Sequence, residues 1–484
     1  MSERFIKTRS ARLAPLRAAP ARMLALALAS TLTACSSLNP LTSFTREKPQ
    51  SVSGFVGDVV ADEPQAALAA RDVLAKGGNA ADAAAALGMA LSVTLPSRAS
   101  LGAGGACLAW KPGEQEGHAF IFLPNAGQVD AKADRPAAVP MLVRGLYLMQ
   151  LRYGSVEFGD VVLPARNMAR DGVPVSPLLA ADMSAVEGPL LADDKTRSIF
   201  SNGNGQVLKA SDLMVQPRLA GALERIRLAG AGDFYTGALA ETFAQAAQAA
   251  GGGLSKADLR NSLATTERPL TLHTNGVDIS FLPPPADGGL GTAAAFTGNQ
   301  AQATVRGEAV VSGWRARQAG KGTSVSVADA QALLNSGSLP SGSALPPLPA
   351  STSFVVTDRQ GGVVSCGLTM NNLFGTGRVA GSTGIILAAS PANRPLPLLT
   401  AAIAHNGTSQ FRAAATASGQ NVAADTAAVA LQAALAGGRP EVTNGPGRAN
   451  FVSCPAGLPG NSAKCFGWTD PRGNGLAVSS GEQK

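Results

Sequence analysis

The feature that most constrains this chain is an alanine-rich segment, residues 80–93, which is apolar around nearly its whole circumference. Asn79 is a suitable N-cap for a helix over this segment, and Pro96 follows its end. A helix that lacks a polar face is stable only when other elements cover it on all sides. The segment therefore predicts a large layered domain in which this helix is an inner element.

The other patterns mix helical and extended segments without regular strand–helix–strand units. Helices are expected over residues 63–75 with Asp62 as the N-cap, over most of 141–250, and over 424–434, which precedes an irregular tail. Strands are expected over residues 270–282, 351–357 and 363–370. Residues 336–350, rich in Gly, Ser and Pro, are an expected exposed connector. This mixture predicts an α/β or α+β layered fold.

The positive charge of the chain is concentrated at its start. Residues 1–34 hold six Lys or Arg and one Glu, so they contribute +5 of the formal net charge of +7. The remaining charge of +2 is too small for a nucleic-acid-binding surface. An apolar run over 23–33 follows the basic residues and is too short to span a bilayer. Residues 1–34 are therefore predicted to be a secretory signal peptide.

This signal ends in Leu32-Thr33-Ala34-Cys35, which resembles the lipobox of bacterial lipoproteins. The resemblance implies that Cys35 is lipidated and that residues 35–54 form a tether. An ordinary signal peptide followed by a coincidental cysteine is the alternative. No aspartate follows Cys35, and by the same resemblance this favours the outer membrane of a bacterial cell envelope, facing the periplasm.

An exported protein lies in an oxidising compartment, where cysteines can pair. Cys454 and Cys465 flank a Gly- and Pro-rich loop and are predicted to form a local disulfide. Cys107 and Cys366 lie in apolar sequence and are expected to be buried free thiols. With three His and five Cys in the chain, no multi-ligand metal site is expected, and no cofactor is predicted.

The predicted hairpin carries a candidate catalytic pair. Its turn centres on Gln360, so Ser351 lies opposite Thr369, with Cβ atoms roughly 4.5–5.5 Å apart. If the bond between Ala350 and Ser351 were cut, the new α-amine, which titrates near pH 8, could act as a base for the serine hydroxyl. One residue would then supply both nucleophile and base, without histidine. A serine that begins a strand is, however, common without any such role.

Several motifs in matching order resemble the γ-glutamyltranspeptidase family of N-terminal-nucleophile hydrolases. They include the segments 77–84 (GGNAADAA), 102–105 (GAGG), 143–146 (VRGL), 152–154 (RYG), 169–172 (ARDG), 283–289 (PPPADGG) and 371–381 (NNLFGTGRVAG). The resemblance implies an αββα sandwich and a precursor that cuts itself between Ala350 and Ser351. Residues 55–350 would be the large segment and residues 351–484 the small one, intertwined in one domain.

The resemblance also implies roles for individual residues. Ser351 falls at the nucleophile position and Thr369 at that of a threonine that hydrogen-bonds the nucleophile. Asn371 and Asn393 fall at positions that bind the ammonium group of the substrate, with Asn393 replacing an Asp. Gly419 and Gln420 fall near the glycines whose N–H groups form the oxyanion hole.

Other positions differ from the family. The segment 122–126 lacks the arginine that binds the glutamate carboxylate, and Leu398 and Leu399 replace paired serines. An apolar pair would leave a polar head group without partners, so weak γ-glutamyl turnover is expected. Two hypotheses follow: a self-processing hydrolase or acyltransferase that acts on a small-molecule amide, γ-glutamyl or less polar, and a catalytically silent binding or scaffolding lipoprotein. The sequence predicts no oligomeric state.

Overall fold

The structure is a computed structural model and describes residues 54–128, 133–298, 303–319, 326–442 and 444–480. The predicted signal peptide, Cys35 and all but the last residue of the predicted tether lie outside these ranges. Within them, no helix combines the length and the apolar character that a membrane span requires.

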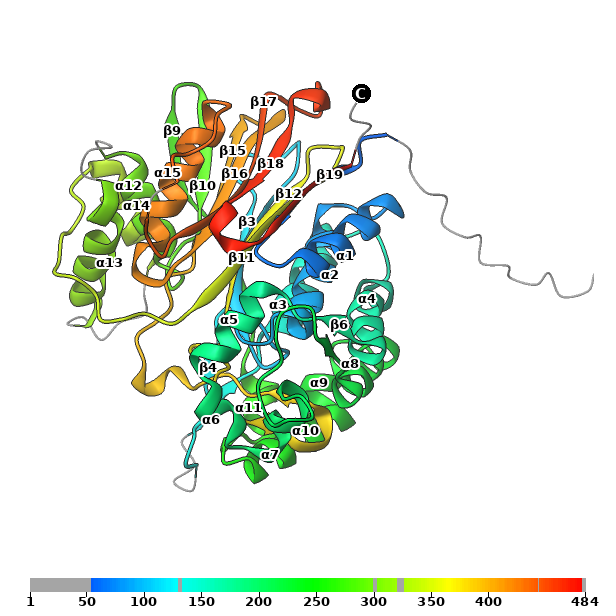
Figure 1. The fold of residues 1–484 in the computed structure, drawn as a ribbon. Coiled ribbons are helices and arrows are strands. Elements are labelled where there is room, and N and C mark those ends of the chain that lie inside the picture. Colours follow the sequence, from blue (N-terminus) through cyan, green and yellow to red (C-terminus); the bar gives the residue numbers. More distant parts are fainter. Residues whose placement is uncertain (1–53, 129–132, 299–302, 320–325, 443, 481–484) are drawn as a thin grey trace, which may run out of the picture. The chain divides into compact units, whose positions relative to one another are not determined.

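Two antiparallel sheets lie face to face (Figure 1). In the described part of the chain, the first sheet has seven strands, in the order β19 (Leu476–Ser480), β1 (Gly57–Ala61), β11 (Ser351–Thr357), β12 (Val363–Thr369), β2 (Gly104–Trp110), β3 (His118–Phe122) and β8 (Thr265–Glu267). The second, counted over the same residues, has six, in the order β18 (Phe466–Thr469), β17 (Arg448–Leu458), β16 (Gln410–Ser418), β15 (Ala402–Asn406), β10 (Val277–Phe281) and β9 (Leu270–Thr274). Strands β11 and β12 of the first sheet contact β16 of the second.

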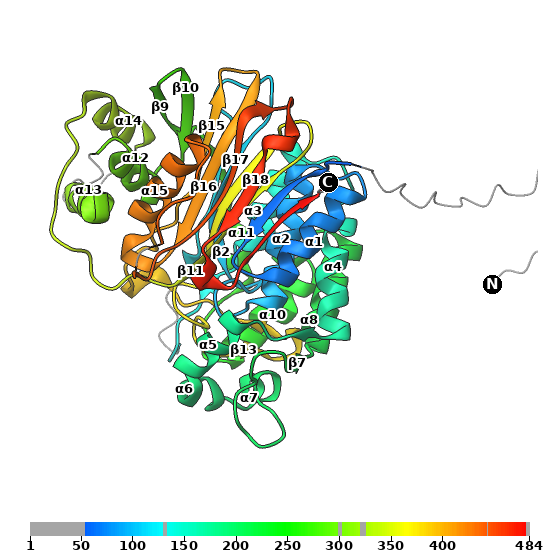
Figure 2. The same cartoon turned by 45° about the horizontal axis from the view of Figure 1, so that its top comes forward.

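Helices cover the outer face of each sheet, which gives four layers (Figure 2). The first sheet is covered by α1 (Pro64–Ala75), α2 (Ala80–Thr94) and α3 (Leu142–Tyr153), with α4 (Phe158–Asp171) packed on α2. The second is covered by α12 (Gly288–Phe296), α14 (Val327–Ser336) and α15 (Ala423–Leu435), with α13 (Ala303–Ala319) packed on α12 and α15. Further helices lie beside the first layer: α5 (Pro177–Ala185), α6 (Glu187–Leu191), α7 (Asp194–Phe200), α8 (Pro217–Ala229), α9 (Asp233–Thr236), α10 (Ala238–Ala249) and α11 (Lys256–Asn261). The layered α/β prediction is confirmed.

The inner helix predicted from its apolar circumference is α2, and every residue of it is buried. Asn79 caps it: the Asn79 side chain accepts from the N–H of Asp82, and the Asp82 side chain accepts from that of Asn79. Apolar side chains fill the space between α2 and the first sheet, the space between the sheets, and the space between the second sheet and its helices. This helix is therefore covered on all sides, as its composition requires.

Three sequence predictions need correction. Glu63, and not Asp62, caps α1, because the Glu63 carboxylate accepts from the N–H of Ala66. The expected single strand 270–282 is a hairpin, because Asn275 and Gly276 have φ of 51° and 75° and form a tight turn. The expected irregular tail contains β17, β18 and β19, which complete both sheets.

The hairpin of β11 and β12 lies in the middle of the first sheet, between β1 and β2. The carboxylate of Asp358 holds its turn by accepting from the N–H groups of Gln360 and Gly362, both at 2.9 Å. The same carboxylate accepts from the N–H of Ala80, in the first turn of α2. A carboxylate is favourable at the N-terminus of a helix, so this contact fixes the hairpin against α2.

Candidate active site

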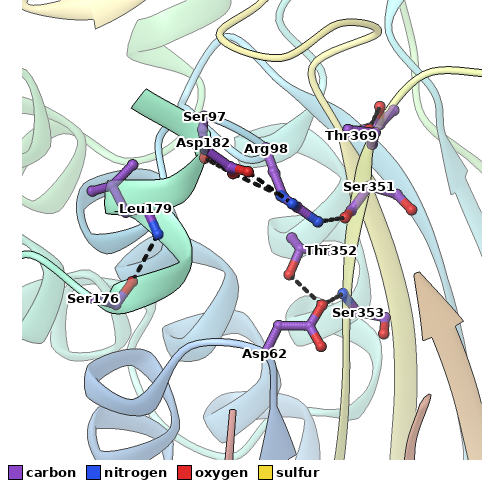
Figure 3. A network of polar contacts seen from close by, with 11 residues as sticks. Asp62, Ser97, Arg98, Ser176, Leu179, Asp182, Ser351, Thr352, Ser353 and Thr369 are labelled. Atoms are coloured by element: carbon purple, nitrogen blue, oxygen red, sulfur yellow. Dashed lines mark hydrogen bonds and ion pairs between the residues drawn. The ribbon is translucent and has the colours of Figure 1, made fainter. Parts of the chain in front are cut away.

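The strand register places Ser351 directly opposite Thr369, as the hairpin arithmetic predicts. Both residues are buried, with 3% and 0% of their surface exposed. The structure describes the chain with the peptide bond between Ala350 and Ser351 intact. Figure 3 shows the two side chains on neighbouring strands, within a network of polar contacts.

The hydroxyl of Thr369 contacts the peptide bond that precedes Ser351. Its Oγ1 donates to the carbonyl oxygen of Ala350 at 2.8 Å and accepts from the N–H of Asn371 at 3.0 Å. The resemblance predicted a bond from Thr369 to the Ser351 hydroxyl instead. Within the described residues, the Ser351 Oγ is buried and has no hydrogen-bond partner. In the uncut chain, then, Thr369 polarises a carbonyl and leaves the serine hydroxyl unbonded.

Arg98 fixes the other side of Ser351. Its Nη1 donates to the Ser351 carbonyl oxygen at 3.1 Å, and its Nε and Nη2 donate to the two carboxylate oxygens of Asp182, both at 2.8 Å. Ser97 Oγ also donates to Asp182, at 2.7 Å. Burial works to lower the pKa of Arg98, but the hydrogen bonds and charge of Asp182 outweigh it and raise that pKa. A permanent positive charge therefore lies beside the backbone of Ser351.

Helix α5 presents Asp182 to this arginine. Ser176 caps the helix by accepting from the N–H of Leu179 at 3.2 Å (Figure 3). Asp182 is 5% exposed, so its pairing with Arg98 is nearly free of competing water. Losing either partner would leave an uncompensated buried charge.

Asp62, the expected helix cap, lies instead beneath the start of β11. Its Oδ2 accepts from Thr352 Oγ1 and from the N–H of Ser353, both at 3.0 Å, and its Oδ1 accepts from Asn450 Nδ2 at 2.7 Å. Burial raises the pKa of Asp62, against the lowering effect of these bonds and of the Arg98 charge. Asp62 thus ties the first residues of β11 to β17 of the opposite sheet.

The structure brings Asn371 to this site and gives a partial view of Asn393. Asn371 is buried, has a φ of 56°, and donates from Nδ2 to the carbonyl of Ala389 at 3.1 Å. Its Oδ1 has no partner within the described part of the chain. Asn393 ends a short 3₁₀ turn, 391–393, and the placement of its side chain lies outside what the structure describes.

Gly419 and Gln420 begin the turn between β16 and α15. Gly419 has a φ of 129°, and a Cβ on it would lie 2.6 Å from the Cα of Gly447, so only glycine fits. Gln420 Nε2 donates to the carbonyl of Leu348 at 3.0 Å. The neighbouring Asn421 also contacts the connector. The Gln420 side chain is therefore engaged with the segment that leads to Ser351.

The prediction of free thiols at Cys107 and Cys366 is wrong, because the two form a disulfide. They are paired residues on the adjacent strands β2 and β12. The sequence separates them by 259 positions, so only the sheet register brings them together. The predicted disulfide between Cys454 and Cys465 is present.

Among the described residues, the Asp58 carboxylate and the sulfurs of Cys454 and Cys465 are close enough to hold a metal ion. The two sulfurs are bonded to each other, so neither is a thiolate that could bind one.

A cavity of about 730 Å³ lies next to Asn371. Asn372 and Ala389, which adjoin or contact Asn371, are part of its wall, and Arg135 and Arg394 supply positive charge. Among the described residues of the wall, the acidic one is Asp134, which is paired with Arg378 at 2.8 Å. The cavity is large enough for a small-molecule ligand, and the described part of its wall has net positive charge.

Comparisons with known proteins agree with this architecture. The family model described as gamma-glutamyltranspeptidase matches residues 66–299. The glutathione hydrolase proenzyme of Escherichia coli is 31% identical over 385 residues, which is 69% of this chain and 65% of that protein. The family match and this relative support a place for the chain in the γ-glutamyltranspeptidase family.

Other relatives of the γ-glutamyltranspeptidase family are matched over shorter stretches. Glutathione hydrolase 3 of Arabidopsis thaliana is 32% identical over 247 residues, 49% of this chain and 39% of that protein. The chain thus spans less than two thirds of the length of these relatives. The cephalosporin acylase of Bacillus halodurans has the same fold, with a TM-score of 0.70 and 18% identity over 91% of this chain and 99% of that one. The family-model match ends before Ser351, so the role of Ser351 is argued from the geometry of the site and not from that match.

The sequence reasoning missed Arg98, Asp182 and the true place of Asp62. A lone arginine between an all-apolar helix and a glycine-rich strand was a usable signal, because a charge there must be buried and paired. Nothing in the sequence indicated that its partner lies 84 positions away.

Proposed function

We propose that this protein is a self-cleaving amidohydrolase or acyltransferase whose nucleophile is Ser351. The observation that carries the proposal is the hydrogen bond from Thr369 Oγ1 to the Ala350 carbonyl, beside the unbonded Ser351 hydroxyl. A donor aimed at a carbonyl stabilises the negative charge that develops on its oxygen during attack. The γ-glutamyltranspeptidase family and the acylase fold support the same reading.

The self-cleavage would proceed in two steps. The Ser351 Oγ attacks the Ala350 carbonyl carbon, the bond from that carbon to the Ser351 nitrogen breaks, and the hydroxyl proton passes to the nitrogen. An ester then joins Ala350 to Ser351 Oγ, and Ser351 has a free α-amine. Water hydrolyses the ester, which leaves a carboxylate on Ala350 and restores the hydroxyl.

In the cut protein, the α-amine is the base for the hydroxyl. Near neutral pH such an amine exists partly in its neutral form. The fixed charge of Arg98, bonded to the carbonyl of the same residue, favours that neutral form. Ser351 would take the acyl group of an amide substrate as an ester, and water or an amine would then accept it.

The relatives named glutathione hydrolase make a γ-glutamyl amide the first substrate to test. Leu398 and Leu399 are both 1% exposed and pack in apolar clusters, so they offer no polar contact to a glutamate head group. We therefore propose an amide substrate with a less polar acyl group, and weak turnover of γ-glutamyl anilides.

The test is a reducing denaturing gel of the purified protein. Fragments that end at Ala350 and begin at Ser351, with the Ser351 terminus read by sequencing, support the proposal. Ser351→Ala should leave the chain uncut, and Ser351→Thr, which keeps a hydroxyl, should be cut. If Ser351→Ala is cut at the same bond, a separate protease is responsible and the proposed mechanism is wrong. An uncut wild-type chain would favour a catalytically silent binding protein.

We also propose that the protein is exported and lipidated at Cys35, on the strength of the signal-like residues 1–34 and the lipobox-like 32–35. Mass spectrometry of the membrane fraction should find a diacylglyceryl thioether on Cys35. A Cys35→Ser variant should leave the membrane fraction, and its retention there would contradict the proposal.

A further inference from the structure

The connector between α14 and β11 lies in the protein as a bound peptide. Asn421 Oδ1 accepts from the N–H of Leu348 at 3.0 Å, and Asn421 Nδ2 donates to the carbonyls of Leu345 at 3.0 Å and Pro346 at 3.2 Å. Gln420 adds a bond to the carbonyl of Leu348. These contacts are to backbone atoms, so they would hold any peptide of the same extended course.

One further contact fixes the start of this segment. Glu308 Oε1 accepts from the N–H of Leu345 at 2.8 Å and from Asn421 Nδ2 at 2.9 Å. Glu308 lies on α13 and Asn421 lies just before α15, among the helices that cover the second sheet. We call the surface on which these two side chains hold the connector the groove. At its far end, Thr369 holds the carbonyl of Ala350.

The side chain of Leu348 fills an apolar pocket in this groove. It is 2% exposed and belongs to a small cluster with Val311, Leu398, Ala423 and Ala424. By the family resemblance described above, Leu398 replaces one of the paired serines. The exchange that removes polar contacts for a glutamate head group thus supplies an apolar contact for a leucine.

The direction of self-cleavage indicates which part of a substrate this pocket would bind. In self-cleavage, the group transferred to Ser351 is the carbonyl of Ala350, so everything before Ala350 belongs to the acyl side. Leu348 is therefore the residue two positions before the reacting carbonyl. Once the bond is cut, the connector is held by the chain only at the end of α14, and a substrate can displace it.

We propose that the groove, formed by Glu308, Asn421 and the apolar pocket that Leu348 fills, is the acyl-side subsite of the mature enzyme. Its substrate class would be a peptide amide with a leucine two positions before a small residue at the reacting carbonyl. The inference rests on the proposed function of Ser351. The Ser351 Oγ adds to the carbonyl of the small residue, the amine leaves with a proton, and water releases the peptide as a carboxylate.

The test compares three anilides on the cut wild-type protein: acetyl-Leu-Pro-Ala, acetyl-Gly-Pro-Ala and γ-glutamyl p-nitroanilide. We expect kcat/KM for the leucine peptide to exceed that for the glycine peptide at least about tenfold, because an apolar pocket distinguishes even a single methylene by about that factor. The leucine peptide should also exceed the γ-glutamyl compound. The ratio of two substrates on one sample does not depend on the fraction of enzyme that is active.

Two variants and a control locate the effect. Leu398→Ser should move the leucine-to-glycine ratio toward one. Asn421→Ala should lower kcat/KM for both peptides alike and keep their ratio, because its contacts are to backbone atoms. Leu431→Ala is the matched control: this leucine of α15 is also fully buried, but it lies in the cluster beneath the second sheet, so the ratio should not change.

The outcomes separate the inference from the proposed function. If turnover is lost in Ser351→Ala but the wild type has equal kcat/KM for the leucine and glycine peptides, the proposed subsite is wrong and the role of Ser351 as nucleophile is retained. A preference for the γ-glutamyl compound has the same consequence. A chain that is neither cut nor active on any of the three overturns both. If Leu398→Ser does not fold, the wild-type ratio and Asn421→Ala still decide.

Discussion

The disulfide between Cys107 and Cys366 changes how self-cleavage would be seen. Cys107 precedes the proposed cut and Cys366 follows it, so the bridge would join the two fragments covalently. Without reductant, the cut protein should run as one species near the size of the uncut chain. With reductant, it should separate into two fragments, the smaller beginning at Ser351 and containing 134 of the 484 residues.

The same bridge should also stabilise the uncut chain strongly. It closes a loop over a separation of 259 residues, for which the chain-entropy relation gives about 5–6 kcal/mol. The bridge between Cys454 and Cys465 spans 11 residues, for which the same relation gives about 3 kcal/mol. Since whole domains are stable by only about 5–15 kcal/mol, losing the first bridge is the graver change.

Urea unfolding of two variants in the uncut Ser351→Ala background measures this difference. The double variant C107A/C366A should lose more stability than C454A/C465A, by about 2–3 kcal/mol. Equal losses would refute the entropic argument. Cut protein that separates into two fragments without reductant would show that the bridge is not formed.

Three further predictions concern the site and its surroundings. Thr369→Val removes the hydroxyl that donates to the Ala350 carbonyl and should slow self-cleavage, followed on reducing gels, about 10²–10³-fold. Thr369→Ser keeps a hydroxyl and should be much less affected. An unchanged rate of cleavage in Thr369→Val would contradict the role of this donor. Arg98→Gln removes a positive charge beside the Ser351 amine, so the amine pKa should rise and the acidic limb of kcat/KM should move upward by on the order of one pH unit; an unmoved limb would show that this charge does not tune the amine. Burial raises the pKa of Asp58 from its ordinary 3.8 to about 6, while Ser479 opposes the shift, so the folded state favours the protonated carboxyl. The contribution of this protonation to the free energy of unfolding is complete below about pH 4 and is lost as the pH rises through 6. Asp58→Asn should therefore be more stable than wild type at pH 7 by up to about 3 kcal/mol. Urea unfolding curves of the wild type that are alike from pH 4 to 8 would contradict this prediction.

Local patterns were sufficient for α1, α2, α15, the helical region within 141–250 and the hairpin at the site, but they did not predict α12, α13 or α14. Asn79 and the apolar circumference of 80–93 set the start and the burial of α2, because capping and periodicity depend on neighbours in sequence. The register of Ser351 and Thr369 followed from the turn, because a short hairpin fixes its own pairing. The strands after α15 were missed, because each forms only when a distant strand is beside it.

The sequence by itself determined a layered fold with a buried helix, a hairpin that pairs a serine with a threonine, and a connector that leads into it. Only the tertiary structure decided which atoms meet there: Thr369 with the Ala350 carbonyl, Arg98 with Asp182 and Ser351, and Cys107 with Cys366. The physical reason is one of range. Caps, turns and periodicity act over a few residues, whereas the pairing of buried charges, thiols and carbonyls depends on how whole layers pack.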